Sequence, residues 1–437
     1  MTTYDEQPDI MAIGDSMYQG IRSMSFLPAM VNHSTPKQVA DAIGMSMTVP
    51  DLQQPLLFDL EAELRRGGLL HLLEHIRGAC LDNLKAWPLD RPWSQHEAFD
   101  NIAVAGAEIA SLYQDTDAKY FDQVRDLSAK LSDTNLSLAE LATTIGNLWF
   151  ALDNCYTLNP RHRDEQRSKS QLDQVADRQP QILLINIGTN EGLFMAGFAG
   201  DFSEQTLARV ATIPDLLQPV AERLKALPER VERIVFNGLI RPRFIPNLMP
   251  SPEHENDYPG DDYYFAYGPR IGSTQTAISG AKLKAFDEMI ADVNARSQAM
   301  LKDTVGDRVA FADIYEDCPQ FDGKHYMGRG LAIPGNGKTL NNKPITPIPF
   351  GYYGGFAGID NMHPTVPGYA AIADVVLTAL GRGSVHTDKA AAYAADTLLN
   401  NVRGLPLLIA EIELSLLGAF GVFRGGGTAP AAQQPIV

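Results

Sequence analysis

The sequence predicts an α/β fold in which helices cover both faces of a parallel sheet. Short apolar segments alternate along the chain with segments whose apolar residues recur at helical spacing. One apolar segment, QILLINIG at 181–188, is a continuous run, as expected of a strand buried on both faces. Buried strands that alternate with helices favour parallel strands joined by crossover helices.

Five segments have the character of strands in this sheet. The first, DIMAI at 9–13, leads into Gly-Asp-Ser, and the second, FDNIAVAG at 99–106, ends in glycine. The third, at 181–188, leads into Thr-Asn-Glu, and the last two are RIVFNGLI at 233–240 and RVAFADIY at 308–315. Ligands of such folds bind beyond the carboxyl ends of the strands, so the residues that follow the strands are the first candidates for function.

Two of the intervening segments show clear helical periodicity. In the first segment, 281–301, one face carries the apolar residues Leu283, Phe286, Ile290 and Val293. In the second, 366–380, one face carries Tyr369, Ile372, Val376 and Leu380. Thr365 is a suitable N-cap for the second helix, and Pro367 fits its first turn.

The five strands and their helices do not use the whole chain. We expect one elaborated domain over 8–384, with the surplus in insertions at about 20–95, 110–180 and 241–305. The remainder, 385–437, is predicted to form an apolar helical segment and a disordered tail. The apolar part, 405–423, contains Glu411 and Glu413, which makes it a poor membrane-spanning helix. Packing on its own domain or on a second copy of the chain is the favoured interpretation.

Composition limits the classes of partner. The chain has 36 basic and 53 acidic side chains and a formal net charge of −17, which argues against nucleic acid as a partner. The three cysteines, Cys80, Cys155 and Cys318, are too far apart to indicate a disulfide framework or a cysteine-based zinc site. The polar N-terminus carries no secretory signal, so the expected location is cytoplasmic by default, or exported if the chain is a trimmed mature form.

The residues after the strands include the parts of an acyl-transfer site. Ser16 follows the first strand, and a serine hydroxyl needs an adjacent base to act as a nucleophile. His363 can be that base, and Asp360 is near enough in sequence to orient its ring. An oxyanion needs hydrogen-bond donors, which the backbone amides of Ser16 and Gly106 and the side-chain amide of Asn190 can supply.

In these residues the chain resembles the GDSL, or SGNH, hydrolases. The four blocks of that family appear in order as GDS, NIAVAG, GTNE and DNMHP. The resemblance implies a flavodoxin-like three-layer α/β/α sandwich and a serine esterase or lipase that needs no metal or organic cofactor. It also implies a nucleophile at Ser16, a base at His363 and an orienting carboxylate at Asp360, with the oxyanion hole formed by Ser16, Gly106 and Asn190.

Two departures from the family pattern concern the surroundings of the site. Glu191 stands where the family usually has aspartate, at a position that generally supports the local loop. The gap between the first two blocks is unusually long, which affects the substrate pocket more than the mechanism. The order NIAVAGAEI is slightly closer to the phospholipase-B-like branch, so lipid or other acyl esters are the favoured substrates, with carbohydrate O-acetyl groups as the alternative. The loops at 263–272 and 349–360 are rich in glycine and aromatic residues and could line either pocket.

Other interpretations of the same residues remain open. Ser16 could be a helix N-cap, Gly106 a tight turn, Asn190 a turn amide, Asp360 a loop-stabilising side chain and His363 a buried structural histidine. The stretch HLLEH at 71–75 matches the inverted zinc-protease pattern, in which His71 and His75 would bind zinc and Glu74 would activate water. No third ligand is evident, and a packing face of a helix is the simpler interpretation. A non-catalytic binding protein on a hydrolase fold is the remaining alternative.

Overall fold

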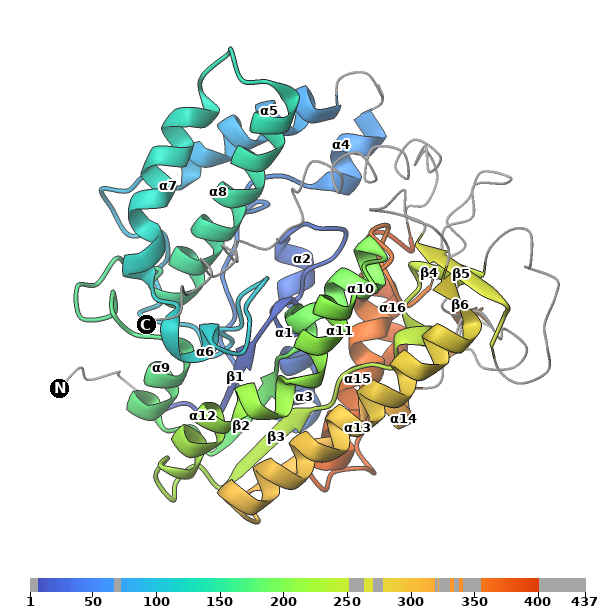
Figure 1. Ribbon diagram of the computed structural model, residues 1–437. Coiled ribbons are helices and arrows are strands. Elements are labelled where there is room, and N and C mark those ends of the chain that lie inside the picture. Colours follow the sequence, from blue (N-terminus) through green and yellow to red (C-terminus); the bar gives the residue numbers. More distant parts are fainter. Residues whose placement is uncertain are drawn as a thin grey trace, which may run out of the picture.

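The central sheet has four parallel strands in the order β1-β2-β3-β7 (Figure 1). The computed structural model describes residues 7–66, 72–250, 263–269, 278–318, 321, 331–333, 338–340 and 355–400. The strands are β1 (Ile10–Gly14), β2 (Ile182–Asn186), β3 (Arg233–Asn237) and β7 (Val309–Ala312). Across the sheet, Ala12, Leu184, Val235 and Ala310 lie side by side. The predicted α/β class and four of the predicted strands are therefore confirmed.

The fifth predicted strand, at 99–106, forms one isolated parallel bridge to β1 instead of a ladder. Asn101 pairs with Ala12, on the side of β1 away from β2. A second bridge would need the Gly14 amide to donate to Ile102, but that amide donates to Gln171 Oε1 at 2.7 Å. The segment still follows β1, because Val104 donates to the carbonyl of Gly14 at 3.0 Å. With this segment included, the order is that of a flavodoxin-like doubly wound sheet.

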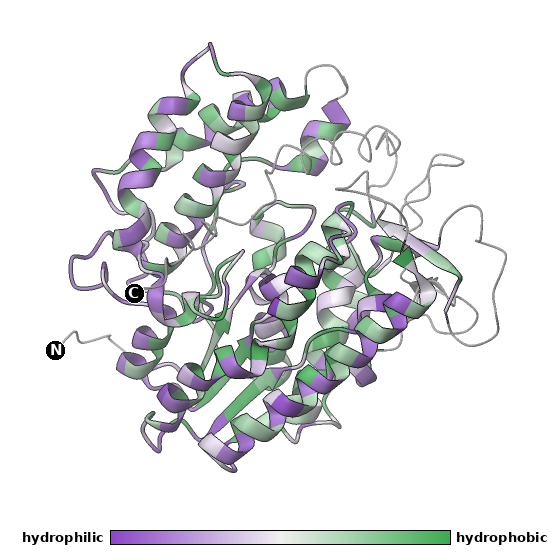
Figure 2. Cartoon of the chain, in the orientation of Figure 1, coloured by the Kyte–Doolittle hydropathy of each residue, from purple (hydrophilic) through white to green (hydrophobic). Residues whose placement is uncertain are grey.

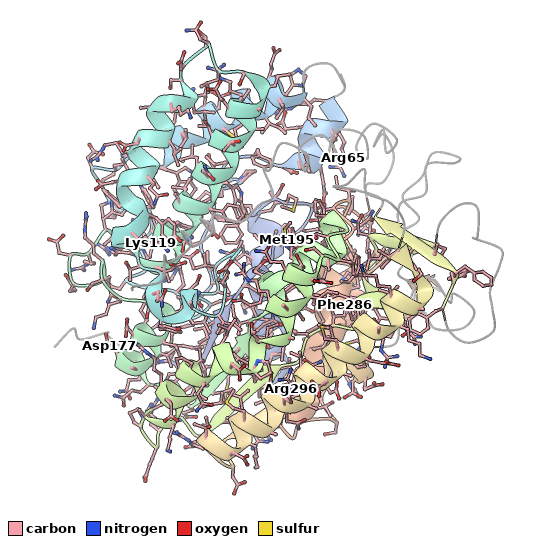
Figure 3. The ribbon with its side chains drawn as sticks, in the orientation of Figure 1. Arg65, Lys119, Asp177, Met195, Phe286 and Arg296 are labelled. Atoms are coloured by element: carbon pink, nitrogen blue, oxygen red, sulfur yellow. The ribbon has the colours of Figure 1, made fainter. Side chains whose placement is uncertain are left out.

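Helices cover both faces of this sheet, as expected of buried parallel strands. On one face lie α3 (Thr35–Ala42) and α15 (Val366–Ala379), which pack on each other, and on the other lie α9 (Gln171–Arg178), α12 (Ile213–Lys225) and α13 (Gly280–Val305). Figure 2 shows apolar strands between helices of mixed polarity. The labelled side chains of α13 in Figure 3 illustrate this, because Phe286 is buried while Arg296 is exposed.

A lobe of helices stands beyond the carboxyl edge of the sheet (Figure 1). Its helices are α4 (Leu60–Arg66), α5 (Leu72–Asn83), α7 (Asp117–Leu131) and α8 (Leu138–Leu158). The last two pack side by side as a hairpin, and a capping box between Ser137 and Glu140 starts α8. The long gap between the first two sequence blocks contributes α4 and α5 to this lobe.

The remaining elements are short. The other helices are α1 (Ser16–Gln19), α2 (Pro28–Val31), α6 (Ser111–Gln114), α10 (Phe194–Ala199), α11 (Glu204–Ala211), α14 (Ile314–Asp317) and α16 (Lys389–Ala395). Two small antiparallel sheets are formed by β4 (Leu248–Pro250), β5 (Ala266–Pro269) and β6 (Ile278–Ser279), and by β8 (Leu331–Ile333) and β9 (Lys338–Leu340). The apolar segment at 405–423 lies outside the described residues.

The cysteines and the possibility of a membrane-spanning helix were both considered from the sequence. Cys80, Cys155 and Cys318 are buried free thiols. Among the residues that the structure describes, no helix combines the length and the apolar character needed to cross a bilayer.

A buried ion cluster joins three distant parts of the chain near the end of β1. Arg22 binds Glu61 of α4 through two hydrogen bonds, of 2.8 and 3.0 Å, and binds Asp396 at 3.0 Å. All three side chains are fully or almost fully buried. Asp396 also accepts from the Val366 amide at the start of α15. The cluster therefore ties the lobe, the segment after α16 and the first turn of α15 together.

We predict that Arg22→Met lowers the free energy of unfolding by about 3–5 kcal/mol, because it removes the cation that two buried carboxylates share. Urea unfolding followed by circular dichroism measures this change. The control is Arg125→Met, which removes an exposed ion pair to Asp122 and should change the free energy by less than about 1 kcal/mol. Equal effects of the two substitutions would contradict the importance of the buried cluster.

Candidate active site

Ser16 owes its position to a sharp turn at the end of β1. Gly14 has a φ of +133°, and a Cβ at this position would lie 1.8 Å from the carbonyl oxygen of Asn186 in the neighbouring strand. Asp15 then caps α1, because its Oδ1 accepts from the Met17 amide at 3.1 Å. The hydroxyl of Ser16, the first residue of α1, lines a cavity beyond the carboxyl edge of the sheet.

Asp360 and His363 come from the turn that precedes α15. The Asp360 Oδ1 accepts from the amides of Met362 and His363, both at 3.0 Å, which folds the turn back on the carboxylate. Its Oδ2 lies 2.7 Å from His363 Nδ1. Because a carboxylate only accepts, Nδ1 donates to it, which leaves Nε2 of the neutral imidazole as an acceptor. The Ser16 hydroxyl lies 3.0 Å from that Nε2, so the three side chains form a continuous hydrogen-bonded relay.

A further donor to Asp360 has no counterpart in the sequence motifs. The Met24 amide donates to Asp360 Oδ2 at 2.9 Å. Ser23 and Met24 have φ values of +52° and +54°, an uncommon conformation for non-glycine residues that turns this amide toward the carboxylate. The Ser23 hydroxyl donates to Glu61, so the buried ion cluster also supports this turn. A residue in the left-handed region that is not glycine, asparagine or aspartate has no sequence signature.

The pKa values of Asp360, which belongs to the relay, and of the nearby Asp15 are shifted in opposite directions. Burial by itself would raise the pKa of Asp360, but the adjacent His363 and the hydrogen bonds to the carboxylate outweigh burial and hold the pKa below its ordinary value. Burial raises the pKa of Asp15 to about 6, although hydrogen bonds from Met17 and Asn186 oppose the rise. Asp360 is therefore ionised throughout the neutral range, as a partner for an imidazolium must be.

Three donors converge beside Ser16. Within the described part of the chain, the backbone amides of Ser16 and Gly106 donate no hydrogen bond. Gly106 has a φ of +74°, which favours glycine. The Asn190 amide donates one hydrogen to the Ala107 carbonyl at 2.8 Å, which orients the group and leaves its second hydrogen available. Ser16, Gly106, Asn190 and His363 all line the same cavity, and Asp360 is hydrogen-bonded to His363, so the structure brings the predicted site residues together.

Glu191 supports the loop next to these donors. Its Oε1 accepts from the Ile109 amide at 2.7 Å, and its Oε2 pairs with Arg209 at 2.9 Å. Arg209 also pairs with Glu108 at 2.6 Å. Glutamate in place of the usual aspartate thus connects the loop after β2 with the loop that carries Gly106.

The walls of the cavity are largely apolar and come from the loop after α1, from Phe58 just before α4, from α8 and from α10. The space between atoms in it amounts to about 600 Å³, part of it open to solvent. Its apolar and aromatic lining consists of Ile21, Met24, Phe58, Trp149, Phe150 and Phe194, and Gly146 adds a position without a side chain. The described parts of the two aromatic loops, 263–269 and 355–360, do not line it, and 270–272 and 349–354 lie outside the described residues.

The residues of the alternative zinc site are only partly visible. His75 lies on α5 and is partly exposed, whereas His71 lies outside the described residues. In the ranges that the structure describes, no three histidine, cysteine, aspartate or glutamate side chains come together in a way that could hold a metal ion.

Comparison with known proteins gave one family match. The model of the GDSL-like lipase/acylhydrolase family matches residues 10–376, which include all the residues of the relay and of the converging donors. Neither the curated proteins nor the solved structures gave a match.

We predict that Asp15→Asn becomes increasingly stabilising as the pH rises. The folded-state pKa of Asp15, about 6, lies above the unfolded value of 3.8, so its contribution to stability is complete below pH 3.8 and is lost as the pH rises through 6. Between those limits, the free energy of unfolding of the variant should gain about 3 kcal/mol relative to the natural chain. Urea unfolding of both proteins from pH 4 to pH 8 measures the difference. A difference that does not vary with pH would contradict the raised pKa.

Proposed function

Because the chain belongs to the GDSL-like lipase/acylhydrolase family, a family of acyl ester hydrolases, we propose that Ser16, His363 and Asp360 are its catalytic triad. The observation that carries this proposal is the relay itself, with 3.0 Å between Ser16 Oγ and His363 Nε2 and 2.7 Å between His363 Nδ1 and Asp360 Oδ2. These distances are within the range in which a base takes a proton from its nucleophile.

The proposed reaction proceeds through an acyl-enzyme. The Ser16 oxygen attacks the ester carbonyl carbon while its proton passes to His363 Nε2, and Asp360 stabilises the imidazolium that forms. The negative charge moves to the carbonyl oxygen, which accepts hydrogen bonds from the amides of Ser16 and Gly106 and from Asn190. When the tetrahedral intermediate collapses, the alcohol leaves with the proton from His363. Water then attacks the acyl group, again with His363 as the base, and releases the acid.

We further propose that the acyl part of the substrate is an apolar chain, which favours lipid or other acyl esters. The support is the aromatic and aliphatic wall around Ser16, contributed by Phe58, Trp149, Phe150 and Phe194. A cavity with this lining suits a hydrocarbon chain, whose burial contributes about 0.8 kcal/mol per methylene group. An acetyl group on a sugar would use little of this surface.

Substitution of Ser16 tests its role as the nucleophile. Ser16→Ala should abolish hydrolysis of p-nitrophenyl butyrate, because the only atom removed is the attacking oxygen, while the circular dichroism spectrum and the unfolding midpoint stay unchanged. An organophosphonate probe should label the natural chain and leave the variant unlabelled. A folded variant that keeps its turnover, or a natural chain that neither hydrolyses esters nor takes the probe, would contradict the triad and favour a binding protein.

A substitution in the cavity wall tests whether the cavity binds the acyl chain. Gly146→Leu places a four-carbon side chain in the wall of the cavity, so kcat/KM for p-nitrophenyl esters of eight or more carbons should fall about 10-fold or more relative to the acetate ester. Gly78→Leu is the matched control, because Gly78 lies exposed on α5 with open space around the position of a Cβ.

The preference of the natural chain for esters of different acyl length can also contradict the proposal. Activity confined to acetyl esters in the natural chain, with no change in preference in Gly146→Leu, would contradict the apolar acyl chain and favour a carbohydrate O-deacetylase.

A further inference from the structure

A buried polar cluster outside the triad holds the loop that carries Gly106. The amide of Ala105, one residue before Gly106, donates to Gln19 Oε1 at 2.8 Å and to Asp153 Oδ2 at 3.1 Å. Gln19 Nε2 donates to the other oxygen of Asp153 at 2.5 Å. Gln19 and Asp153 are both fully buried. A side chain of α1 and a side chain of α8 therefore hold the same backbone amide.

The donors around Asp153 call for a group that only accepts. Gln19 and Ala105 each present an N–H to the carboxylate, and the Thr157 hydroxyl lies 3.3 Å from its Oδ1. A carboxylate satisfies all of them, whereas an amide would turn an N–H toward one of the donors. Asp153 forms no ion pair in the described part of the chain, and burial raises its pKa to about 7. A buried carboxyl group without a cation is costly, so its presence beside Ala105 needs a reason.

Gln19 also links the two backbone amides of the oxyanion hole. It is the last residue of α1, the single turn of helix that begins with Ser16. Its side chain thus connects the element that carries the Ser16 amide to the residue before Gly106. The Asp153 carboxylate fixes which way the Gln19 amide group faces, because it accepts from Nε2 and so turns Oε1 toward Ala105.

We propose that Gln19 and Asp153 are positioning residues for ester hydrolysis, which together set the distance between the Ser16 and Gly106 amides so that both reach the same oxyanion. This inference rests on the proposed function. Neither side chain lines the cavity around Ser16, so both act through Ala105 and the loop that follows it. Transition-state stabilisation is sensitive to such placement, because a shift of about 1 Å costs on the order of 100-fold in rate.

The first experiment replaces the carboxylate with an amide of the same shape. Asp153→Asn should lower kcat for p-nitrophenyl butyrate about 10- to 100-fold with KM within about twofold of the natural value, because the substrate in its ground state does not need the oxyanion hole. The inhibition constant of an alkylboronic acid, whose tetrahedral adduct places an oxygen in that hole, should rise by a similar factor. The unfolding midpoint should not fall, because the substitution removes a buried charge.

The second experiment exchanges the two groups. In Gln19→Glu/Asp153→Asn, the carboxylate sits on α1 and the amide on α8, so the hydrogen bond between the two side chains can form again with donor and acceptor reversed. The Ala105 amide again faces two acceptors. We expect kcat and boronate affinity to return to within about threefold of the natural chain. The single variant Gln19→Glu, which sets two carboxyl groups against each other, should remain slow.

Asp117→Asn is the matched control for the loss of a buried carboxyl group. Asp117 is fully buried at the start of α7, where it accepts from Asn159 at 2.8 Å, and this variant should keep kcat within about twofold. A folded Asp153→Asn with the natural kcat, or a folded exchange variant as slow as Asp153→Asn, would overturn the proposal. Should Asp153→Asn fail to fold, the exchange variant decides alone.

The two proposals fail in different ways. Ester hydrolysis that survives Ser16→Ala contradicts the proposed function, whereas hydrolysis that requires Ser16 but is unaffected at Gln19 and Asp153 contradicts only the positioning role.

Discussion

The structure around the site depends on satisfying one buried charge, the carboxylate of Asp360. A fully buried carboxylate is unfavourable unless hydrogen bonds replace its hydration. Asp360 accepts from the ring of His363, from the amides of Met362 and His363 and from the amide of Met24. The first three donors fold the turn before α15, and the fourth brings in the loop after α1. Meeting the requirement of this charge therefore aligns the imidazole with Ser16.

Three buried aspartates near the site show how different surroundings shift the pKa of the same type of side chain in different directions. Asp360 has an imidazole beside it, and its pKa is held low. In the part of the chain that the structure describes, Asp15 and Asp153 accept hydrogen bonds but form no ion pair, and burial raises their pKa values to about 6 and about 7. The first suits the stabilisation of a developing positive charge on His363. The other two organise backbone amides, at Met17 and at Ala105.

The helical lobe both lines the cavity beside Ser16 and holds the loop that carries Gly106. One helix, α8, lines the cavity with Gly146, Trp149 and Phe150, and about one turn later it carries Asp153, which holds Ala105. Phe150 also lies against Gly106, since a Cβ on this glycine would be 2.7 Å from its ring. In the proposed mechanism, the apolar wall for the acyl group and the support of the loop that carries Gly106 are thus parts of one helix. The long gap in the family's sequence pattern contributes α4 and α5 to this lobe, and the order of the strands is not altered.

The sequence by itself determined the fold class, four of the strands and every residue of the relay, because these depend on local patterns: apolar runs, helical periodicity and short motifs at strand ends. The Asp-x-x-His spacing also indicates that the two side chains lie close together, because they share one turn. Tertiary structure alone decided what depends on distant donors. The Gln171 side chain accepts the hydrogen bond of the Gly14 amide, and the strand predicted at 99–106 is therefore reduced to a single bridge. Met24, Gln19 and Asp153 support the site through hydrogen bonds between segments far apart in the chain, and such partners have no local signature.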